Sequence, residues 1–315
     1  MAAIGTASRP PQSRSLMTFA RRNALWGYLL IAPVILILLA LIAYPLGFAV
    51  WIAFTDRVVG VPGEWVGLRN FRYLVEWSSF TRAVTNTITI VIVTGIAKLI
   101  LGLGLALIVN ERIRGRGFFR AVLLLPWAMP AFVVFLTWRV LFQPLGGGLN
   151  LLITDLGLMP LFEWVGIAQT GYIDWLGERA LALPSVIVAT IWRGFPFWFI
   201  VLLAALQGIP GDLYEAAKLD GASRVRRFLD VTLPNIRNSI FIVALMSSIW
   251  TANSFENIWI LTQGGPSDAT MILPVLSYFG LQNQRLGEAA AVSVAILPAL
   301  LLMVIVTTRL IEDDD

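Results

Sequence analysis

Two apolar segments carry polar and aromatic residues at helical spacing, and these residues are the clearest candidates for chemistry. Spacings of i, i+3, i+4 and i+7 place side chains on one helical face. In the first segment this spacing selects Thr190, Arg193, Gly194 and Phe197. In the second it selects Ser247, Trp250, Thr251 and Ser254. We call these two sets the polar stripes, and each needs a helix to position it.

Further residues extend the polar stripes. Polarity continues on an adjoining face at Asn253, Glu256 and Asn257, and Trp127 between two prolines is a weaker third contribution. An isolated Ser or Thr more often bonds its own helix or a neighbouring one. Arg193 has two interpretations: it pairs with Glu256, or its charge selects an anionic solute.

The composition indicates that the polar stripes lie in a membrane. The chain has 315 residues, of which 58% are hydrophobic and only 13% charged, whereas soluble domains have about a quarter charged. It therefore reads as an all-α integral membrane protein. Polar groups at depth in a membrane are functional candidates by default. Without His or Cys, the chain has no His- or Cys-based nucleophile, disulfide or metal site, and we expect no cofactor. A net charge of +4 is weak evidence for nucleic acid, and we expect none as a partner.

Six segments are long and apolar enough to span a bilayer. They are Leu25–Phe54, Arg82–Asn110, Phe118–Phe142, Leu183–Leu206, Ile240–Leu261 and Ala289–Leu310. Fourteen of the 23 basic residues fall on one side of these spans and six on the other, which predicts that both termini are cytoplasmic. We expect a disordered arm over residues 1–24, a membrane domain over 25–311 and an acidic tail over 312–315.

The connection between the fourth and fifth spans, residues 208–236, predicts two short cytoplasmic helices. Asp212 suits an N-cap with Glu215 three residues later, and Gly221 can take a left-handed C-cap conformation. Ser223 can cap a second helix that runs to about residue 231, before Pro234 stops it. The loop either lies on lipid head groups or docks a cytoplasmic partner, and composition alone does not decide.

The residues of this loop resemble a known family. The run 214–222 (YEAAKLDGA), followed by Phe228 and residues 232–234 (TLP), is similar to the EAA loop of ATP-binding-cassette importer permeases, in the form of the maltose-type carbohydrate branch. Other stretches resemble the same branch: residues 67–71 (GLRNF), 86–87 (NT), 118–120 (FFR) with 125–126 (LP), 192–197 (WRGFPF) and 261–266 (LTQGGP).

The resemblance implies a type I importer fold with six transmembrane helices, in the cytoplasmic (inner) membrane of a prokaryote. Such a chain is a non-catalytic half-channel that pairs with a second, homologous permease subunit in a heterodimer. Two ATPase subunits bind on the cytoplasmic side, and an extracytoplasmic solute-binding protein delivers the ligand. The residues implied in coupling to the ATPase are Tyr214, Glu215, Ala216, Ala217, Asp220, Gly221 and Ala222. The polar stripes match stretches that line the sugar site in that family.

A sugar or related polyol suits such a lining, because aromatic rings stack on its apolar face while hydroxyls bond in defined directions. An anionic sugar derivative or glycerol phosphate, selected by Arg193, is the alternative. A stand-alone secondary transporter would need midplane carboxylates, and only Glu256 qualifies. An intramembrane enzyme would need a carboxylate pair, which no predicted span holds.

Overall fold

The computed structural model describes residues 14–111, 114–169 and 171–312, and of residues 14–20 and 22 only the backbone. Its regular elements over these ranges are helices, and the chain divides into two units, Met1–Trp51 and Ile52–Asp315. The first unit is helical from Arg14 onward, so the helix begins within the segment where we expected a disordered arm and runs without a break into the apolar span. Residues 1–13 of that arm and 313–315 of the acidic tail lie outside the described part of the chain.

Two prolines are accommodated by short π-helical turns that precede them. In the first unit, α1 (Arg14–Leu38) leads through a π-helical turn, η1 (Leu39–Ala43), into α2 (Tyr44–Ala53), whose second residue is Pro45. A proline inside a helix removes one hydrogen bond and clashes with the carbonyl four residues earlier. A π-helical turn widens the helix at that place, which explains why the first apolar span runs past Pro45 without a break.

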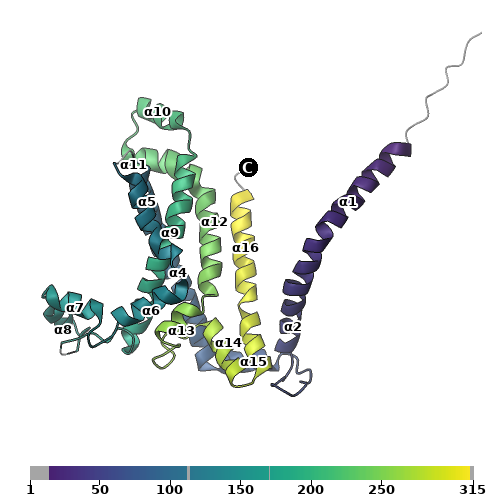
Figure 1. Cartoon of the computed structure of the whole chain (residues 1–315), viewed down its shortest axis with the longest axis horizontal. Coiled ribbons are helices and arrows are strands. Elements are labelled where there is room, and N and C mark those ends of the chain that lie inside the picture. Colours follow the sequence, from purple (N-terminus) through teal and green to yellow (C-terminus); the bar gives the residue numbers. More distant parts are fainter. Residues whose placement is uncertain (1–13, 112–113, 170, 313–315) are drawn as a thin grey trace, which may run out of the picture. The chain divides into compact units, whose positions relative to one another are not determined.

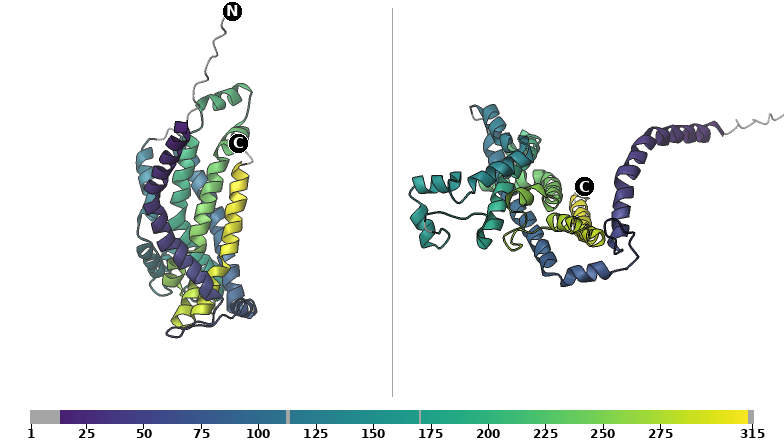
Figure 2. Two further views of the ribbon diagram at one scale, coloured as in Figure 1. Left: turned by 90° about the vertical axis from the view of Figure 1, so that its right-hand side faces the viewer. Right: turned by 60° about the horizontal axis from the view of Figure 1, so that its bottom comes forward.

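The second unit contains the remaining elements (Figures 1 and 2). In chain order they are α3 (Arg69–Glu76), α4 (Ser78–Asn110), α5 (Arg116–Ala128), α6 (Ala131–Leu141), α7 (Gly148–Asp155), α8 (Met159–Trp164), α9 (Arg179–Gln207), α10 (Gly211–Leu219), α11 (Arg224–Arg227), η2 (Phe228–Thr232), α12 (Leu233–Ala252), α13 (Glu256–Leu261), α14 (Leu273–Gln282), α15 (Leu286–Ala295) and α16 (Leu297–Glu312). In Figure 1 and in the left view of Figure 2, α10 and the end of α16 lie at one end of this unit, and α14 and α15 lie at the other.

Five helices of the described chain are long and apolar enough to cross a membrane, or six if the bent pair α5–α6 is one span. The expected span Phe118–Phe142 falls on this bent pair, in which α5 and α6 meet at an angle of 89°. Met129 is extended there and Pro130 donates no backbone hydrogen bond, so the helix breaks before α6. The expected span Ile240–Leu261 is wrong at its end. The long helix stops at Ala252, and α13 is a separate short helix.

The 208–236 loop forms two short helices as predicted, with corrections at their ends. Gly221 has a φ of +75° and ends α10, and the Ser223 hydroxyl accepts a hydrogen bond from the Arg226 backbone N–H at 3.3 Å. Asp212 is not the N-cap, because α10 already begins at Gly211, and its carboxylate lies in the first turn instead. Pro234 does not stop the second helix either. The π-helical turn η2 precedes it, as η1 precedes Pro45, and the helix continues into α12.

The long helices α4 and α9 pack side by side, and small residues allow their close approach. A Cβ added to Gly102 on α4 would come within 2.6 Å of the Trp198 Cβ on α9. Trp198 belongs to one buried apolar cluster with Leu202 and Val243, and Val186 and Ala189 of α9 belong to a second. The middle of α9 therefore passes between two apolar clusters, at the level of the first polar stripe.

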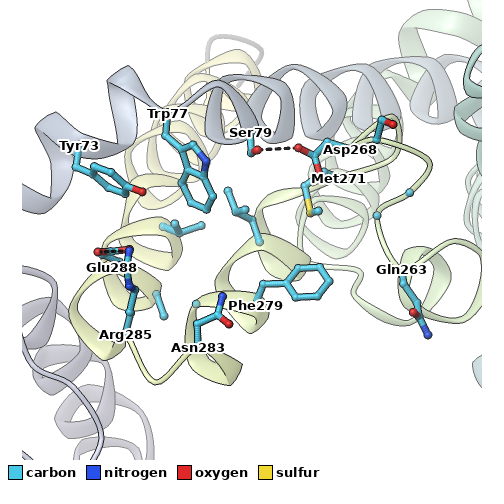
Figure 3. A pocket seen from close by; sticks show the side chains of 17 residues that line it. Tyr73, Trp77, Ser79, Gln263, Asp268, Met271, Phe279, Asn283, Arg285 and Glu288 are labelled. Atoms are coloured by element: carbon cyan, nitrogen blue, oxygen red, sulfur yellow. Dashed lines mark hydrogen bonds and ion pairs between the residues drawn. The ribbon is translucent and has the colours of Figure 1, made fainter.

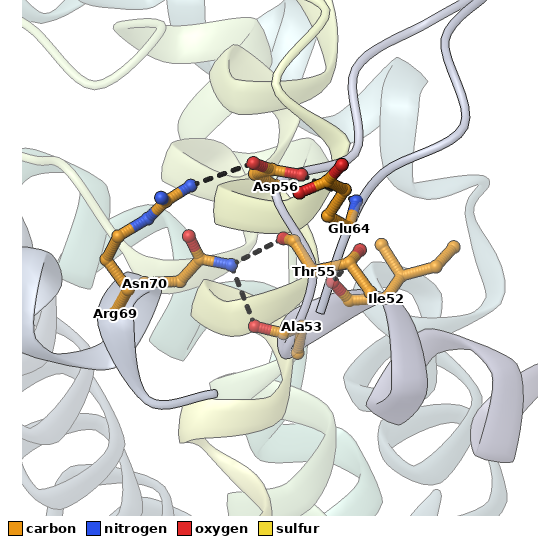
Figure 4. A network of polar contacts seen from close by, with 7 residues as sticks. All are labelled: Ile52, Ala53, Thr55, Asp56, Glu64, Arg69 and Asn70. Atoms are coloured by element: carbon orange, nitrogen blue, oxygen red, sulfur yellow. Dashed lines mark hydrogen bonds and ion pairs between the residues drawn. The ribbon is translucent and has the colours of Figure 1, made fainter. Parts of the chain in front are cut away.

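At the end away from α10, the motif residues serve the structure. Asn70 of the 67–71 motif donates hydrogen bonds to the carbonyls of Ala53 (2.9 Å) and Thr55 (2.8 Å), which ties α3 to the end of the first span (Figure 4). Asp56 beside it pairs with Arg69 at 3.1 Å. The Glu64 backbone N–H, together with the Arg69 guanidinium, holds the pKa of Asp56 below its ordinary value.

A second motif has the same kind of role. The Asn86 amide donates to the backbone carbonyls of Asp268, Ala269 and Met271 at 3.3, 3.1 and 2.9 Å. The neighbouring Thr87 hydroxyl accepts from the Leu273 backbone N–H at 3.2 Å. These bonds hold the 261–271 connection against α4 and satisfy backbone groups that no helix satisfies.

Candidate functional site

A cavity of about 410 Å³ lies between the two apolar clusters, where α4, α5, α6, α9, α12 and α13 meet. We call it the central cavity. All twelve residues that the sequence singled out for a solute site border it. They are Trp127, Thr190, Arg193, Gly194, Phe197, Ser247, Trp250, Thr251, Asn253, Ser254, Glu256 and Asn257. The remaining lining residues are Lys98, Ala131, Phe135 and Phe255.

Three aromatic rings from different helices line the central cavity. Phe197 on α9 lies between Trp127 on α5, whose ring centroid is 6.1 Å away, and Trp250 on α12, at 4.8 Å. Trp127 lies near the end of α5, just before the bend at Pro130. Together the rings form an apolar wall, of the kind on which the flat face of a sugar ring stacks.

Several polar groups of the cavity bond one another. The Asn257 amide donates to the Thr190 hydroxyl at 3.1 Å, and Thr190 donates to the Val186 carbonyl of its own helix at 2.7 Å. Ser254 donates to the Asn257 side-chain oxygen at 2.9 Å. For Thr190 the helix-bonding interpretation is therefore correct, and its hydroxyl also orients Asn257. These contacts fix the polar side of the cavity before any solute enters.

Lys98 is the important residue that the sequence analysis left without a role. It lies on α4, its side chain is only 3% exposed, and its Nζ donates a hydrogen bond to the Thr251 hydroxyl at 3.1 Å. Its stem crosses the face of Gly194, where an added Cβ would come within 2.5 Å of Lys98 Cε. The sequence does show a Lys inside an apolar span, which could have marked Lys98 as a functional candidate. Only the packing of α4 on α9 shows that Gly194 leaves room for its side chain.

Arg193 is half-buried, and its guanidinium carbon lies 6.0 Å from the centroid of the Phe135 ring. Its Nε is buried and has no hydrogen-bond partner among the residues that the structure describes. Glu256 is near enough to act on Arg193 electrostatically, but the two form no ion pair among the described residues. The pairing that the sequence suggested is therefore not made in this structure, where Glu256 is exposed.

A second hollow, of about 570 Å³, opens between α3, α4, α14, α15 and the 263–268 connection (Figure 3). None of the twelve predicted site residues lines it. Its polar groups bond each other, as in the hydrogen bond from Ser79 to Asp268 (2.7 Å) and the Arg285–Glu288 ion pair (3.1 Å). This hollow was not predicted, and its paired charges suit a structural junction.

The 208–236 loop presents an accessible surface. Glu215 and Ala216 are exposed on α10, and so are Asp220 and Gly221 in the turn, while Tyr214, Ala217 and Ala222 are partly covered. The Tyr214 hydroxyl hydrogen-bonds the Thr232 hydroxyl at 3.0 Å, which anchors α10 to η2. The Leu219 side chain at the end of α10 is 90% exposed. Leu213 and Val225 of the same loop are exposed as well, and a surface with several exposed apolar side chains favours contact with another surface.

Residues 98–312 match the family described as the inner membrane component of binding-protein-dependent transport systems. The chain belongs to this family. Its members are the non-catalytic permease subunits of ATP-binding-cassette importers, so ATP hydrolysis and solute capture are the work of partner ATPase and binding-protein components. The predicted family and the inner-membrane location are confirmed, as is the expectation that the chain is not an enzyme.

Individual relatives agree over nearly the whole chain. The trehalose/maltose permease protein MalF of Thermococcus litoralis is 34% identical over 86% of this chain and 89% of its own. The diacetylchitobiose uptake permease NgcF of Streptomyces coelicolor is 30% identical over 92% and 85%. The structure superposes with a TM-score of 0.73 on a bacterial ABC transporter involved in the import of the acidic polysaccharide alginate, at 24% identity over 95% of this chain and 98% of the other. This likeness confirms the predicted importer permease fold.

Proposed function

We propose that this permease subunit carries a sugar or related polyol through the central cavity. The observation that supports it best is the wall of Trp127, Phe197 and Trp250, which faces hydroxyl and amide groups across one cavity. Sugars bind where an aromatic face and directional hydrogen bonds converge. The names of relatives that transport trehalose, maltose and diacetylchitobiose support the same class of solute.

The assembly that we propose follows the family. A second, homologous permease subunit completes the pore in a heterodimer, in the cytoplasmic membrane of a prokaryote. Both termini and the 208–236 loop face the cytoplasm, as the distribution of basic residues favours. The coupling residues Tyr214 to Ala217 and Asp220 to Ala222 dock this loop on one of two ATPase subunits. ATP-driven closure of the ATPase pair then rocks the helices between inward and outward access.

The test is transport by the intact complex. The chain is purified with the subunits that accompany it, and its binding protein is screened against neutral and acidic mono- and disaccharides by thermal unfolding. The sugar with the largest stabilisation is then offered to proteoliposomes that contain the complex. We expect uptake that needs both ATP and the binding protein. A binding protein that recognises only peptides, amino acids or metal ions would overturn the sugar assignment and leave the family unaffected.

A further inference from the structure

We propose that the solute carries an oxyanion, a carboxylate or a phosphate on a sugar, and that Lys98 and Arg193 bind it together in the central cavity. This inference rests on the proposed sugar transport and narrows its substrate class. Four of the sixteen residues that line the cavity support this inference. Lys98 and Arg193 are cations from different helices, and Gly194 lets them approach. Glu256 is the one lining carboxylate, and it pairs with neither cation in the described chain.

Lys98 brings a charge that the protein leaves largely uncompensated. An ammonium has three donor hydrogens, and the one described partner of Lys98 is the Thr251 hydroxyl, a neutral group. Lys98 is 3% exposed, so it is largely withdrawn from bulk water. Burying a charge without a counter-charge is costly, and inside a membrane such groups mark solute or ion paths.

Arg193 brings a second positive charge to the same cavity. Lys98 and Arg193 are close enough to act on each other electrostatically. Gly194, the next residue after Arg193, gives Lys98 its place, because any larger side chain there would push the ammonium away from α9. Two like charges held near each other in an apolar surrounding repel, and an anion between them would remove both costs.

The lining offers no sufficient counter-charge of its own. Glu256 is the one carboxylate among the sixteen lining residues, and it is exposed and makes no ion pair in the described chain. The cavity thus holds two cations against one carboxylate. The buried Arg193 Nε is also an unused donor, and a carboxylate or phosphate accepts the forked bonds of a guanidinium well. The aromatic wall remains for the uncharged part of the sugar.

The test measures binding to the intact importer complex in nanodiscs, without the binding protein. The probes are glucose, glucuronate, glucose 6-phosphate and inorganic phosphate, and the readout is the shift in thermal unfolding as each is titrated. We expect glucuronate or glucose 6-phosphate to bind at least about tenfold more tightly than glucose or inorganic phosphate, because only they combine an oxyanion with a sugar ring. Which of the two binds more tightly identifies the oxyanion.

Three variants assign the effect to residues. Lys98→Met and Arg193→Met should each weaken binding of the acidic sugar about ten- to hundredfold and change glucose binding little. Arg139→Met is the matched control, since it removes one positive charge from an exposed position on α6 outside the cavity. It should bind like the wild type. If the complex does not assemble with Lys98→Met, the binding measured with Arg193→Met still tests the proposal.

Several results would overturn this inference. One is that glucose binds as tightly as glucuronate and glucose 6-phosphate, and that Lys98→Met and Arg193→Met bind these sugars like the wild type. This result would not affect the proposed sugar transport. Inorganic phosphate binding as tightly as the acidic sugars would rule out a sugar-specific oxyanion site. Loss of assembly in Lys98→Met with unchanged acidic-sugar binding in Arg193→Met would mean that Lys98 pairs with a partner subunit. A different result would overturn the proposed function itself, namely a binding protein that recognises no sugar, acidic or neutral.

Discussion

Replacing Gly221 by proline is expected to reduce ATP-driven uptake about tenfold or more, with the transmembrane helices still inserted. Gly221 has a φ of +75°, which proline cannot adopt, and its N–H donates to the Lys218 carbonyl at 3.0 Å. A left-handed residue other than glycine costs about 1–2 kcal/mol, and a lost hydrogen bond about 0.5–1.5 kcal/mol. Together these correspond to a factor of about ten to several hundred in the docking equilibrium.

The measurement is uptake into proteoliposomes, together with the amount of ATPase that co-purifies with the permease. Gly211→Ala is the matched control, because Gly211 starts the same helix α10, has no positive φ and has open space around it. We expect the control to transport like the wild type. Wild-type uptake and ATPase recovery in Gly221→Pro would contradict the docking role of the 208–236 loop.

The geometry of this turn was readable from the sequence because it depends on local chemistry. Only glycine takes a positive φ at little cost, so its place after the helix-forming run 213–219 predicted the end of α10. The beginning of α10 was predicted two residues too late, because several residues there suit a helix start and tertiary context selects among them. Both prolines after π-helical turns escaped prediction for a related reason, since the sequence does not show where a helix widens.

Truncation of Trp250 is the second large expected effect. Trp250→Ala removes a ring that borders the central cavity and whose centroid lies 4.8 Å from that of Phe197. If a sugar stacks there, the loss is about 1–2 kcal/mol, or about 5- to 30-fold in uptake at low solute concentration. Assembly of the complex should be unchanged.

Trp164→Ala is the control for that experiment. Trp164 lies on α8, is 83% exposed and does not border the central cavity. Its loss should leave the uptake rate within about twofold, since surface substitutions away from special features change little. Equal uptake rates in Trp250→Ala, Trp164→Ala and the wild type would show that the Trp250 ring packs against another subunit instead of contacting solute.

The position of the cavity lining was predictable to a large extent, and its charge was not. Helical periodicity alone grouped Thr190 with Phe197 and Ser247 with Thr251, and these groups border one cavity because α9 and α12 pack side by side. Ser254 was grouped with them too, but it borders the cavity from the connection after α12, where the helix has ended. Lys98 belongs to α4, and no spacing relates it to Gly194 ninety-six residues later. Contacts between distant segments depend on the tertiary fold, so the second cation appeared only in the structure.

Protection of a cysteine inside the central cavity tests the central claim most directly. The chain has no native Cys, so Ser254→Cys gives a single reactive thiol in this subunit, and Ser223→Cys in the exposed loop is its control. The intact complex reacts with a small thiol reagent, with and without the sugar that its binding protein selects. If the cavity is the solute path, sugar at about ten times its Kd should slow labelling at position 254 about tenfold and leave position 223 unchanged. Equal labelling rates at position 254 with and without sugar, in a complex that transports that sugar, would contradict the account.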